Sequence, residues 1–301
     1  MGASAGGRWS GVGAEYEGWL ARQPLSANTK RAYRTRVSQY LEYLAATPVE
    51  YGDPLEDFHA RDYAVRDYKG HLKAVRKAKL SSVNLSLAAI DNFYLFLGMG
   101  RPDVRREELA QAAPRSLSGE EQKRFLRAVE RSPEIRDKAV ALLLLYGGLR
   151  IGELCGLDVE DIALSARKGR LVVRSGKGDS YREVVLNSEV RGALSGWLAE
   201  RKGWSGSEEK AALFLSRRGG RLSTRAVDLI VRKLGGEANL DRSLSAHALR
   251  HTCVTNLVRS GADLVLVAEI AGHRRLETTR RYSLPSAADR EAAMEGIRVE
   301  Y

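Results

Sequence analysis

The chain has 301 residues and a formal net charge of +11, with an isoelectric point near 9.7, so its expected partner is a polyanion. No long uninterrupted apolar segment appears, which excludes a membrane-spanning protein and makes nucleic acid a better candidate than a membrane surface. The first residues lack the apolar core of a signal peptide, and two cysteines are too few for a disulfide framework, so we expect a cytoplasmic location.

Residues 1–20 are predicted to form a flexible leader, because they begin with the small residues Met1-Gly-Ala-Ser-Ala-Gly-Gly. Residues 21–100 are expected to form a compact helical domain. Its first helix follows the capping candidates Ser26, Asn28 and Thr29, and its third follows Ser81 and Ser82. Apolar residues recur at helical spacing in each helix and are expected to face the core, and basic residues flank these stripes. The basic residues that we expect to contact DNA are Arg34, Arg36, Lys69, Lys73, Arg76, Lys77 and Lys79.

Residues 101–117 are predicted to be a linker, since they contain two prolines and a run of charges. Directly after them, Ser118-Gly-Glu-Glu121 has the spacing of a capping box and begins a second domain over 118–285. This domain is expected to be mostly helical with a small antiparallel sheet. Its predicted strands cover 171–174 and 183–186, with 213–215 as a short strand or a loop. Its predicted helices cover 135–146, a short stretch from Arg150, 189–201, 223–234, 247–260 and 263–271.

Two arginines of the second domain are candidates for binding a phosphodiester under attack. Such a phosphodiester gains negative charge on its non-bridging oxygens, which planar, always-charged guanidinium groups stabilise. Arg150 follows the Gly147-Gly148 turn at a helix start, where Glu153 lies one turn later and can orient it. Arg250 lies in the run His247-Ala-Leu-Arg250-His251, three residues after His247 and therefore on the same helix face.

His247 can exchange a proton with an attacking or leaving oxygen near neutral pH. An alternative is a metal site made by His247 and His251 at positions i and i+4, but no third ligand occurs at a recognisable spacing. We therefore expect no metal. His251 is interpreted as structural, packing or capping beneath the site.

Tyr282 is the candidate nucleophile, and it follows His273 by nine residues. Attack by its phenol produces a phosphotyrosine ester that conserves the energy of the broken strand, provided that a base or a cationic field removes its proton. Lys177 lies between two glycines in the turn joining the predicted strands. It is the best candidate to protonate the leaving 5′ oxygen, although an ordinary exposed turn lysine is equally compatible with the sequence.

Together these motifs resemble those of the tyrosine recombinases, also called the lambda-integrase family. The segment Gly148-Leu-Arg-Ile-Gly-Glu-Leu is similar to the first arginine box, and His247-Ala-Leu-Arg-His to the His-x-x-Arg box. The segment from Ala271 to Tyr282 is similar to the final box. The match covers roughly 118–285, and residues 26–33 with 81–97 are similar to the family's core-binding, SAM-like domain.

The resemblance implies a two-domain clamp around double-stranded DNA, acting as a homo-tetramer on two sites, with or without a partner recombinase. It implies strand cleavage to a 3′-phosphotyrosine, exchange through a Holliday junction and resealing, with no metal and no other cofactor. The short chain favours an Xer-like or transposon-borne site-specific recombinase. By matching position, the implied catalytic residues are Arg150, Lys177, His247, Arg250, His273 and Tyr282.

Two other functions remain open at this point. A type IB topoisomerase-like or telomere-resolving enzyme uses similar residues, and a non-cutting architectural protein can retain the fold. All six catalytic positions are filled, which argues against the latter. The tail over 286–301 is predicted to contain a short helix and an edge strand, and either to fold back on its own domain or to dock on a neighbouring protomer.

Overall fold

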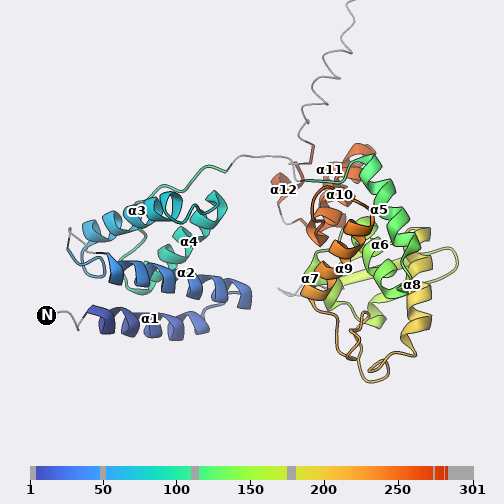
Figure 1. Cartoon of the computed structure of the whole chain (residues 1–301), viewed down its shortest axis with the longest axis horizontal. Coiled ribbons are helices and arrows are strands. Elements are labelled where there is room, and N and C mark those ends of the chain that lie inside the picture. Colours follow the sequence, from blue (N-terminus) through green and yellow to red (C-terminus); the bar gives the residue numbers. More distant parts are fainter. Residues whose placement is uncertain are drawn as a thin grey trace, which may run out of the picture. The chain divides into compact units, whose positions relative to one another are not determined.

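The computed structural model describes residues 5–47, 52–109, 115–174, 181–273, 275–280 and 282–283. The chain divides into two compact units, Met1–Ala110 and Gln111–Tyr301. Over the described residues it is mainly helical with one small antiparallel sheet (Figure 1), which confirms the predicted fold class. No helix within these ranges is long and apolar enough to cross a membrane.

The first unit is a bundle of helices packed around one aromatic-rich core. Its described helices are α1 (Ala5–Arg22), α2 (Ala27–Ala46), α3 (Phe58–Ala74) and α4 (Leu80–Phe96). The Ser26 side chain caps α2 by accepting a hydrogen bond from the Thr29 amide, as predicted. The caps predicted at Ser81 and Ser82 are wrong, because the N-cap residue is Lys79, without a side-chain capping hydrogen bond, and the helix begins at Leu80.

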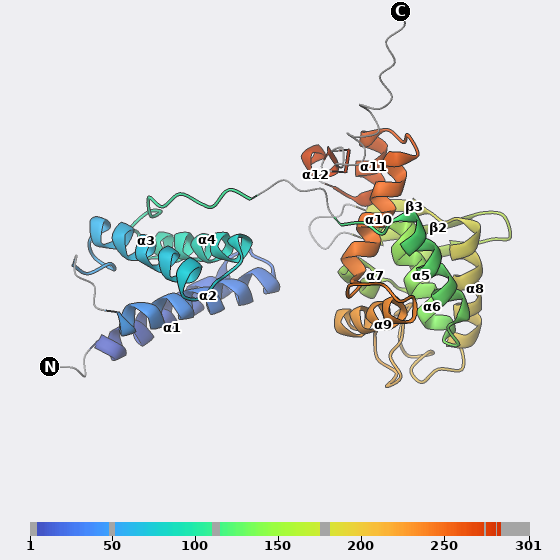
Figure 2. The ribbon, with the colours of Figure 1, turned by 45° about the horizontal axis from the view of Figure 1, so that its top comes forward.

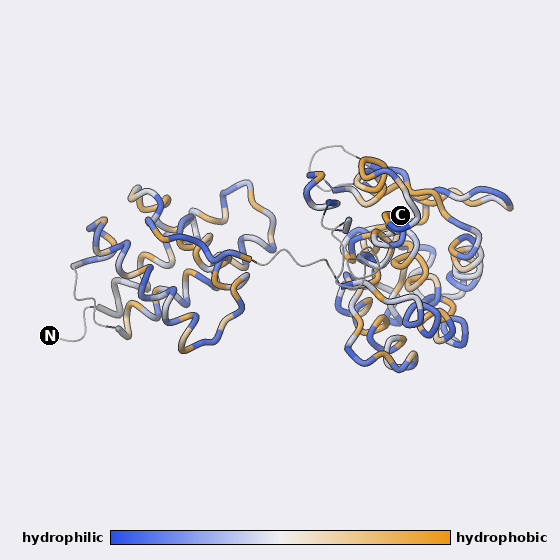
Figure 3. The backbone as a smooth tube through the Cα atoms, turned by 90° about the horizontal axis from the view of Figure 1, so that it is seen from above, coloured by the Kyte–Doolittle hydropathy of each residue, from blue (hydrophilic) through white to orange (hydrophobic). Residues whose placement is uncertain are grey.

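The core of this unit is formed where α2 packs against α1 and α4. Tyr40 and Tyr94 are fully buried, and their hydroxyl groups share a 2.8 Å hydrogen bond. Hydrophobic and hydrophilic stretches are interspersed along the backbone (Figure 3), as expected when helices bury one face.

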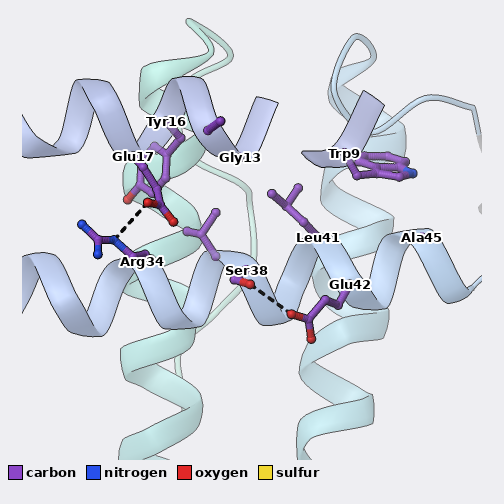
Figure 4. Close-up of a pocket in the computed structure, with 11 residues that line it drawn as sticks. Trp9, Gly13, Tyr16, Glu17, Arg34, Ser38, Leu41, Glu42 and Ala45 are labelled. Carbon is purple, nitrogen blue, oxygen red and sulfur yellow. Dashed lines mark hydrogen bonds and ion pairs between the residues drawn. The ribbon is translucent and has the colours of Figure 1, made fainter. Parts of the chain in front are cut away.

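The prediction of a flexible leader over 1–20 is wrong for residues 5–20, which form most of α1. Tyr16 and Leu20 are each only 1% exposed, and the Tyr16 hydroxyl donates to the Asn92 side chain at 2.8 Å. The glycines of this segment suggested flexibility, but its aromatic residues recur at helical spacing and pack on the core. A cavity of about 460 Å³ remains between α1 and α2, with Trp9 on its lining (Figure 4).

The first half of the predicted linker packs against α3 and α4. The Glu107 carboxylate accepts from Lys73 at 3.0 Å and pairs with Lys69 at 2.9 Å. The Glu107 backbone exchanges two hydrogen bonds with the Asn84 side chain, at 2.8 and 2.9 Å. Residues 101–109 are therefore anchored to the first unit, and the division between the units falls at residue 110, inside the predicted linker 101–117.

The second unit contains the sheet and the remaining described helices. The capping box predicted at Ser118 and Glu121 is present. The helices are α5 (Gly119–Arg131), α6 (Ile135–Gly147), α7 (Ile151–Gly156), the 3-10 turn η1 (Val159–Asp161), α8 (Ser188–Arg201), α9 (Thr224–Glu237), α10 (Ala246–Arg259), α11 (Leu264–Ala271) and α12 (Leu276–Arg280).

The sheet is antiparallel, in the order β1 (Ile162–Leu164), β2 (Gly169–Arg174), β3 (Tyr181–Val185), and Leu171 pairs with Val184. The short elements β1 and α12 were not predicted, since three and five residues carry too little periodicity. The 213–215 segment forms an isolated bridge from Leu215 to Arg221 instead of a strand.

Helix α6 positions the site because it packs against both α8 and α10 in the middle of this unit. Its residues Leu143 and Leu144 have no exposed surface. Helix α10 in turn packs against α11, and β3 lies beside α11 (Figure 2). The chain turn after α6, the start of α10 and the end of α11 are thereby brought together.

Two predicted features lie outside the described residues. The hairpin turn with Lys177 falls within 175–180, and the tail falls within 284–301. The general-acid role of Lys177 and the docking of the tail both stay predictions.

Candidate active site

The site is built around the C-terminal end of α11. Gly272 adopts the left-handed conformation, with φ of 62°, and ends the helix. The amides of Gly272 and His273 bond back to the carbonyls of Glu269 and Ala268, at 2.9 and 2.8 Å. The next carbonyls of this end carry the partial negative charge of the helix dipole and attract cationic side chains.

Three arginines from three different elements donate to three successive carbonyls at this helix end. Arg182, on β3, donates through Nε to the carbonyl of Ile270 at 3.0 Å. Arg250, on α10, donates to the carbonyl of Ala271 at 2.6 Å. Arg150, just before α7, donates to the carbonyl of Gly272 at 2.8 Å. The sequence separates these arginines by up to a hundred residues, and the helix end aligns them immediately before His273.

The carboxylate of Glu153 also contacts the guanidinium groups of these three arginines. It accepts from Arg150 at 2.7 Å and from Arg182 at 2.7 and 3.1 Å, and it lies 4.0 Å from Arg250. Burial opposes ionisation of this carboxyl group, but hydrogen bonds from Arg182 and Arg150 prevail and lower its pKa to about 2. Glu153 is therefore ionised at neutral pH, and its negative charge partly neutralises the positive charges of Arg150, Arg182 and Arg250.

Arg250 and Arg150 differ in their access to solvent. Arg250 is 2% exposed, and it also donates to the carbonyl of Gly148, the left-handed residue that ends α6. Burial, followed by the charge of Arg150, lowers the Arg250 pKa to about 10, so the side chain stays protonated at neutral pH. The Arg150 side chain is 47% exposed and retains N–H donors that face solvent. Arg150 can thus contact an incoming anion directly.

His247 lies in the first turn of α10, where the Ser245 side chain caps the helix by accepting from the Ala248 amide. Partial burial, followed by the charges of Arg250 and Arg150, lowers the pKa of His247 below its ordinary value. The residue remains accessible from solvent, and its ring centroid lies 4.1 Å from that of His251. A neutral imidazole at this place can exchange protons with a bound substrate.

His273 follows the helix end directly and is held by Thr279 of α12. Its Nδ1 shares a 2.8 Å hydrogen bond with the hydroxyl of Thr279, which is completely buried. Burial is the main reason that its pKa falls to about 4, with Arg250 and Arg150 contributing. His273 is consequently neutral at pH 7, and its remaining ring nitrogen is available to a ligand.

Tyr282 contacts the rings of two histidines, His251 and His273. It is 9% exposed and packs with Val254 and Val267. Its ring stacks on that of His273 with centroids 6.1 Å apart, and its hydroxyl forms a hydrogen bond with Nδ1 of His251. The interpretation of His251 as packing or capping beneath the site is therefore incomplete, because this side chain contacts the hydroxyl of the candidate nucleophile.

Of the six catalytic candidates, Arg150, His247, Arg250, His273 and Tyr282 come together in the second unit, and Lys177 lies outside the described residues. The sequence-based interpretation assigned no role to Arg182 or Thr279. A signal for Arg182 existed, since residues 182, 184 and 186 share one face of a strand and Val184 and Leu186 are apolar. No comparable signal marked Thr279. Within the described ranges, no group of histidine, cysteine and acidic side chains is arranged to hold a metal ion.

We expect His273 to remain neutral in the DNA-free protein until the pH approaches about 4, because of its burial and the nearby arginines. The unfolded chain binds this proton below about pH 6.5, so the free energy of unfolding falls as the pH drops from there through about 4. An NMR titration of the imidazole signals measures the midpoint, with His273→Asn identifying the resonance. A midpoint near 6.5 would contradict the burial argument.

Models of known families match both units of the chain. The model described as the phage integrase family matches residues 115–288, and that of the phage integrase N-terminal SAM-like domain matches residues 15–98. The first match alone spans more than half of the chain. The protein therefore belongs to the phage integrase, or tyrosine recombinase, family, and it is an enzyme of site-specific recombination that cleaves and rejoins DNA.

Individual relatives agree with this assignment. The chain is 27% identical over 293 residues to a TnP I resolvase of Bacillus thuringiensis, covering 94% of this chain and 99% of the relative. It is 35% identical over 235 residues to a tyrosine recombinase XerC of Myxococcus xanthus, covering 73% and 76%. A crystal structure of XerA recombinase matches with 27% identity and a TM-score of 0.55, covering 96% and 99%. The Tn1549 transposon integrase in complex with transposon right end DNA shares the fold, with a TM-score of 0.71 at 19% identity and coverage of 94% and 98%.

Proposed function

We propose that Tyr282 attacks a DNA phosphodiester and becomes linked to its 3′ phosphate, and that Arg150, Arg250, His247 and His273 assist the reaction. The observation that supports this most is the alignment of arginines at the end of α11. Arg150 and Arg250 bond adjacent carbonyls immediately before His273, and Tyr282 stacks on the same histidine. A phosphate bound by these arginines would lie close to His273, on whose ring Tyr282 stacks.

Each residue has a role that follows from its surroundings. Arg150 and Arg250 stabilise the charge that grows on the non-bridging oxygens, and their positions are held before the reaction by Glu153 and the helix end. His273 is neutral, so the ring nitrogen not engaged by Thr279 can bond a phosphate oxygen without exchanging a proton with solvent. His247 and Lys177 are the candidates for proton exchange on the side of the leaving oxygen.

The partner is double-stranded DNA, and membership of the family supports a proposal for the finer features. We propose that the protein acts in the cytoplasm as a homo-tetramer on two DNA sites, alone or with a partner recombinase. Strand exchange then passes through a Holliday junction, and no metal or other cofactor takes part.

Covalent trapping tests this proposal. The full chain is first used to select its binding sequence from a random pool of duplexes, and a nicked suicide substrate is built on that sequence. We expect a protein–DNA adduct that resists denaturation, and a phosphotyrosine at position 282 when its peptides are analysed by mass spectrometry. Attachment at another residue would contradict the proposal. Relaxation of supercoiled DNA that lacks the selected site would instead indicate a topoisomerase-like activity.

The seven predicted DNA-binding residues of the first unit fall into two groups. Arg34 pairs with Glu17 at 3.2 Å (Figure 4), Arg36 donates to Gln39, and Lys69 and Lys73 pair with Glu107. The others are Arg76, Lys77 and Lys79, which are exposed between α3 and α4. We propose that this second group binds phosphates more strongly, because none of its members has an ion pair with another described residue that binding would have to break.

Replacing Arg76, Lys77 and Lys79 by alanine is expected to weaken DNA binding and to reduce its salt dependence. The slope of log affinity against log salt should decrease by about 0.9 for each phosphate that the variant no longer neutralises. Gel-shift titrations at several salt concentrations measure this slope. The Arg34→Ala and Arg36→Ala double variant is the control and should change it less. An unchanged slope in the triple variant would remove these residues from the interface.

A further inference from the structure

The hydroxyl of Tyr282 contacts a histidine outside the catalytic set that the family resemblance implies. His251 lies one turn after His247 on α10, and its Nδ1 shares a hydrogen bond with the Tyr282 hydroxyl. The two ring centroids lie 5.5 Å apart, with the rings inclined by 46°. The phenol oxygen is therefore within hydrogen-bond distance of an imidazole nitrogen. This oxygen must lose its proton when it attacks phosphorus.

A phenol needs such a partner because its ordinary pKa is about 10, well above neutral pH. Imidazole is the side chain best suited to accept a proton near neutrality. For this role the ring must be neutral, with its proton on Nε2, so that Nδ1 accepts the hydrogen bond and the Tyr282 hydroxyl donates it. The position of His251 on helix α10 and the packing of Tyr282 with Val254 of the same helix keep the two groups together.

We propose that His251 is a catalytic residue, the general base that takes the proton of Tyr282 during strand cleavage and returns it during rejoining. This inference rests on the proposed role of Tyr282 as the nucleophile. In cleavage, the bond from Tyr282 Oη to phosphorus forms while the bond to the 5′ oxygen breaks. The phenol proton moves to Nδ1 of His251, and the leaving oxygen takes a proton from the acid on its own side.

In rejoining, the same protons move in reverse. The 5′ hydroxyl attacks phosphorus and gives its proton back to that acid, while Tyr282 Oη leaves and recovers its proton from His251. The atoms and charges therefore balance in both directions, and no metal or external reactant is needed. The division of labour assigns His251 to the nucleophile and leaves His247 and Lys177 to the leaving group.

The charged and titratable groups around His251 come from several elements. On α10, the ring of His247 lies 4.1 Å away, and Arg250 interacts electrostatically with Tyr282. After α11, the ring of His273 stacks on that of Tyr282, with the centroids 6.1 Å apart. Arg150, Glu153 and Arg182 are the other charged groups that interact electrostatically with Arg250. The arginines favour the phenolate, so they assist transfer of the proton away from Tyr282.

The test compares single-turnover adduct formation across a pH series in the wild-type chain, His251→Asn and His251→Ala. The probe is the nicked suicide duplex built on the sequence selected by the wild-type chain. Asparagine retains an oxygen near the position of Nδ1 that can accept the hydrogen bond but cannot take up a proton. The control is His59→Asn, because His59 is an exposed histidine of α3.

We expect His251→Asn and His251→Ala to slow cleavage by roughly 10²–10⁴-fold, the usual contribution of a general base, while His59→Asn cleaves as the wild type does. In both His251 variants the rate should rise with hydroxide concentration, because the phenol must then ionise unaided. A His251→Asn variant that cleaves at the wild-type rate with the wild-type pH profile would overturn the inference and leave Tyr282 as the nucleophile. A wild-type chain that forms no adduct would overturn the proposed function as well.

Two further measurements show whether a His251 variant is slow because proton transfer from Tyr282 is lost or because Tyr282 is no longer positioned correctly. Incorporation of a fluorinated tyrosine at position 282, whose phenol ionises more readily, should restore His251→Asn more than it changes the wild type. A bridging sulfur in place of the 5′ oxygen, which needs no acid to leave, should not restore it. Rescue by sulfur, or failure of the fluorinated residue to help, would place the defect elsewhere and overturn the assignment.

Discussion

Tyr282→Phe is expected to abolish the covalent protein–DNA adduct completely while leaving DNA binding within about twofold of the wild type. The change removes only the attacking oxygen, which holds the hydrogen bond to His251. The phenylalanine ring can still stack on His273 and pack with Val254 and Val267. Loss of the hydrogen bond to His251 should lower the free energy of unfolding by about 1 kcal/mol.

Denaturing gels measure the adduct, and gel shifts measure binding. Tyr181→Phe is the control, because Tyr181 lies in the same unit with 75% of its surface exposed. It should form the adduct at the wild-type rate. An adduct formed by Tyr282→Phe would mean that the nucleophile is another residue.

The second large effect is expected at the two arginines. Loss of one preorganised donor to a developing oxyanion typically costs about 10²–10³ in rate, so Arg150→Ala and Arg250→Ala should each slow cleavage by at least about a hundredfold. Affinity should change far less, because many basic residues share the binding of phosphates. Single-turnover cleavage and gel-shift titration measure the two quantities separately.

The two variants should differ in stability. Arg250 is 2% exposed and binds the carbonyls of Gly148 and Ala271, so its removal leaves buried acceptors that each cost about 1–3 kcal/mol. Arg150 is half-exposed, and its removal should change the unfolding free energy little. The matched control is Arg221→Ala, since Arg221 is 42% exposed and also binds a carboxylate, that of Asp158, and backbone carbonyls. Cleavage by Arg150→Ala or Arg250→Ala within tenfold of Arg221→Ala would contradict the proposed role at the phosphate.

Local features of the fold could be predicted where a signal lies within a few residues. The Ser118 capping box, the cap at Ser26 and the strands on both sides of the hairpin all follow from neighbouring side chains and backbone propensity. The prediction was wrong for α1, where glycine content outweighed an aromatic stripe whose partners on α4 lie about 75 residues away. The aromatic spacing was a local sign of that burial, and the glycines between the aromatic residues obscured it.

The same distinction holds for the site. Motif spacing singled out Arg150, His247, Arg250, His273 and Tyr282 as a set, because each box places its residue types at fixed local distances. Spacing also suggested Glu153 as the partner of Arg150, which the structure confirms. It did not identify Arg182 or Thr279, and it assigned His251 to a structural role.

By itself, then, the sequence determined the two-part helical architecture, the basic character and the residue types needed for attack on a phosphodiester, because these depend on composition and on spacing along the chain. Only the tertiary structure decided how those residues are held. The end of α11 offers three successive carbonyls, and Glu153 offers one carboxylate, to arginines that come from β3, from the residue before α7 and from α10. The hydrogen bond between His251 and Tyr282 likewise depends on tertiary packing. Because α10 packs against α11, the imidazole of His251 on α10 reaches Tyr282, which follows α11 in the chain. Hydrogen-bond direction and burial depend on packing between distant segments, which no local pattern records.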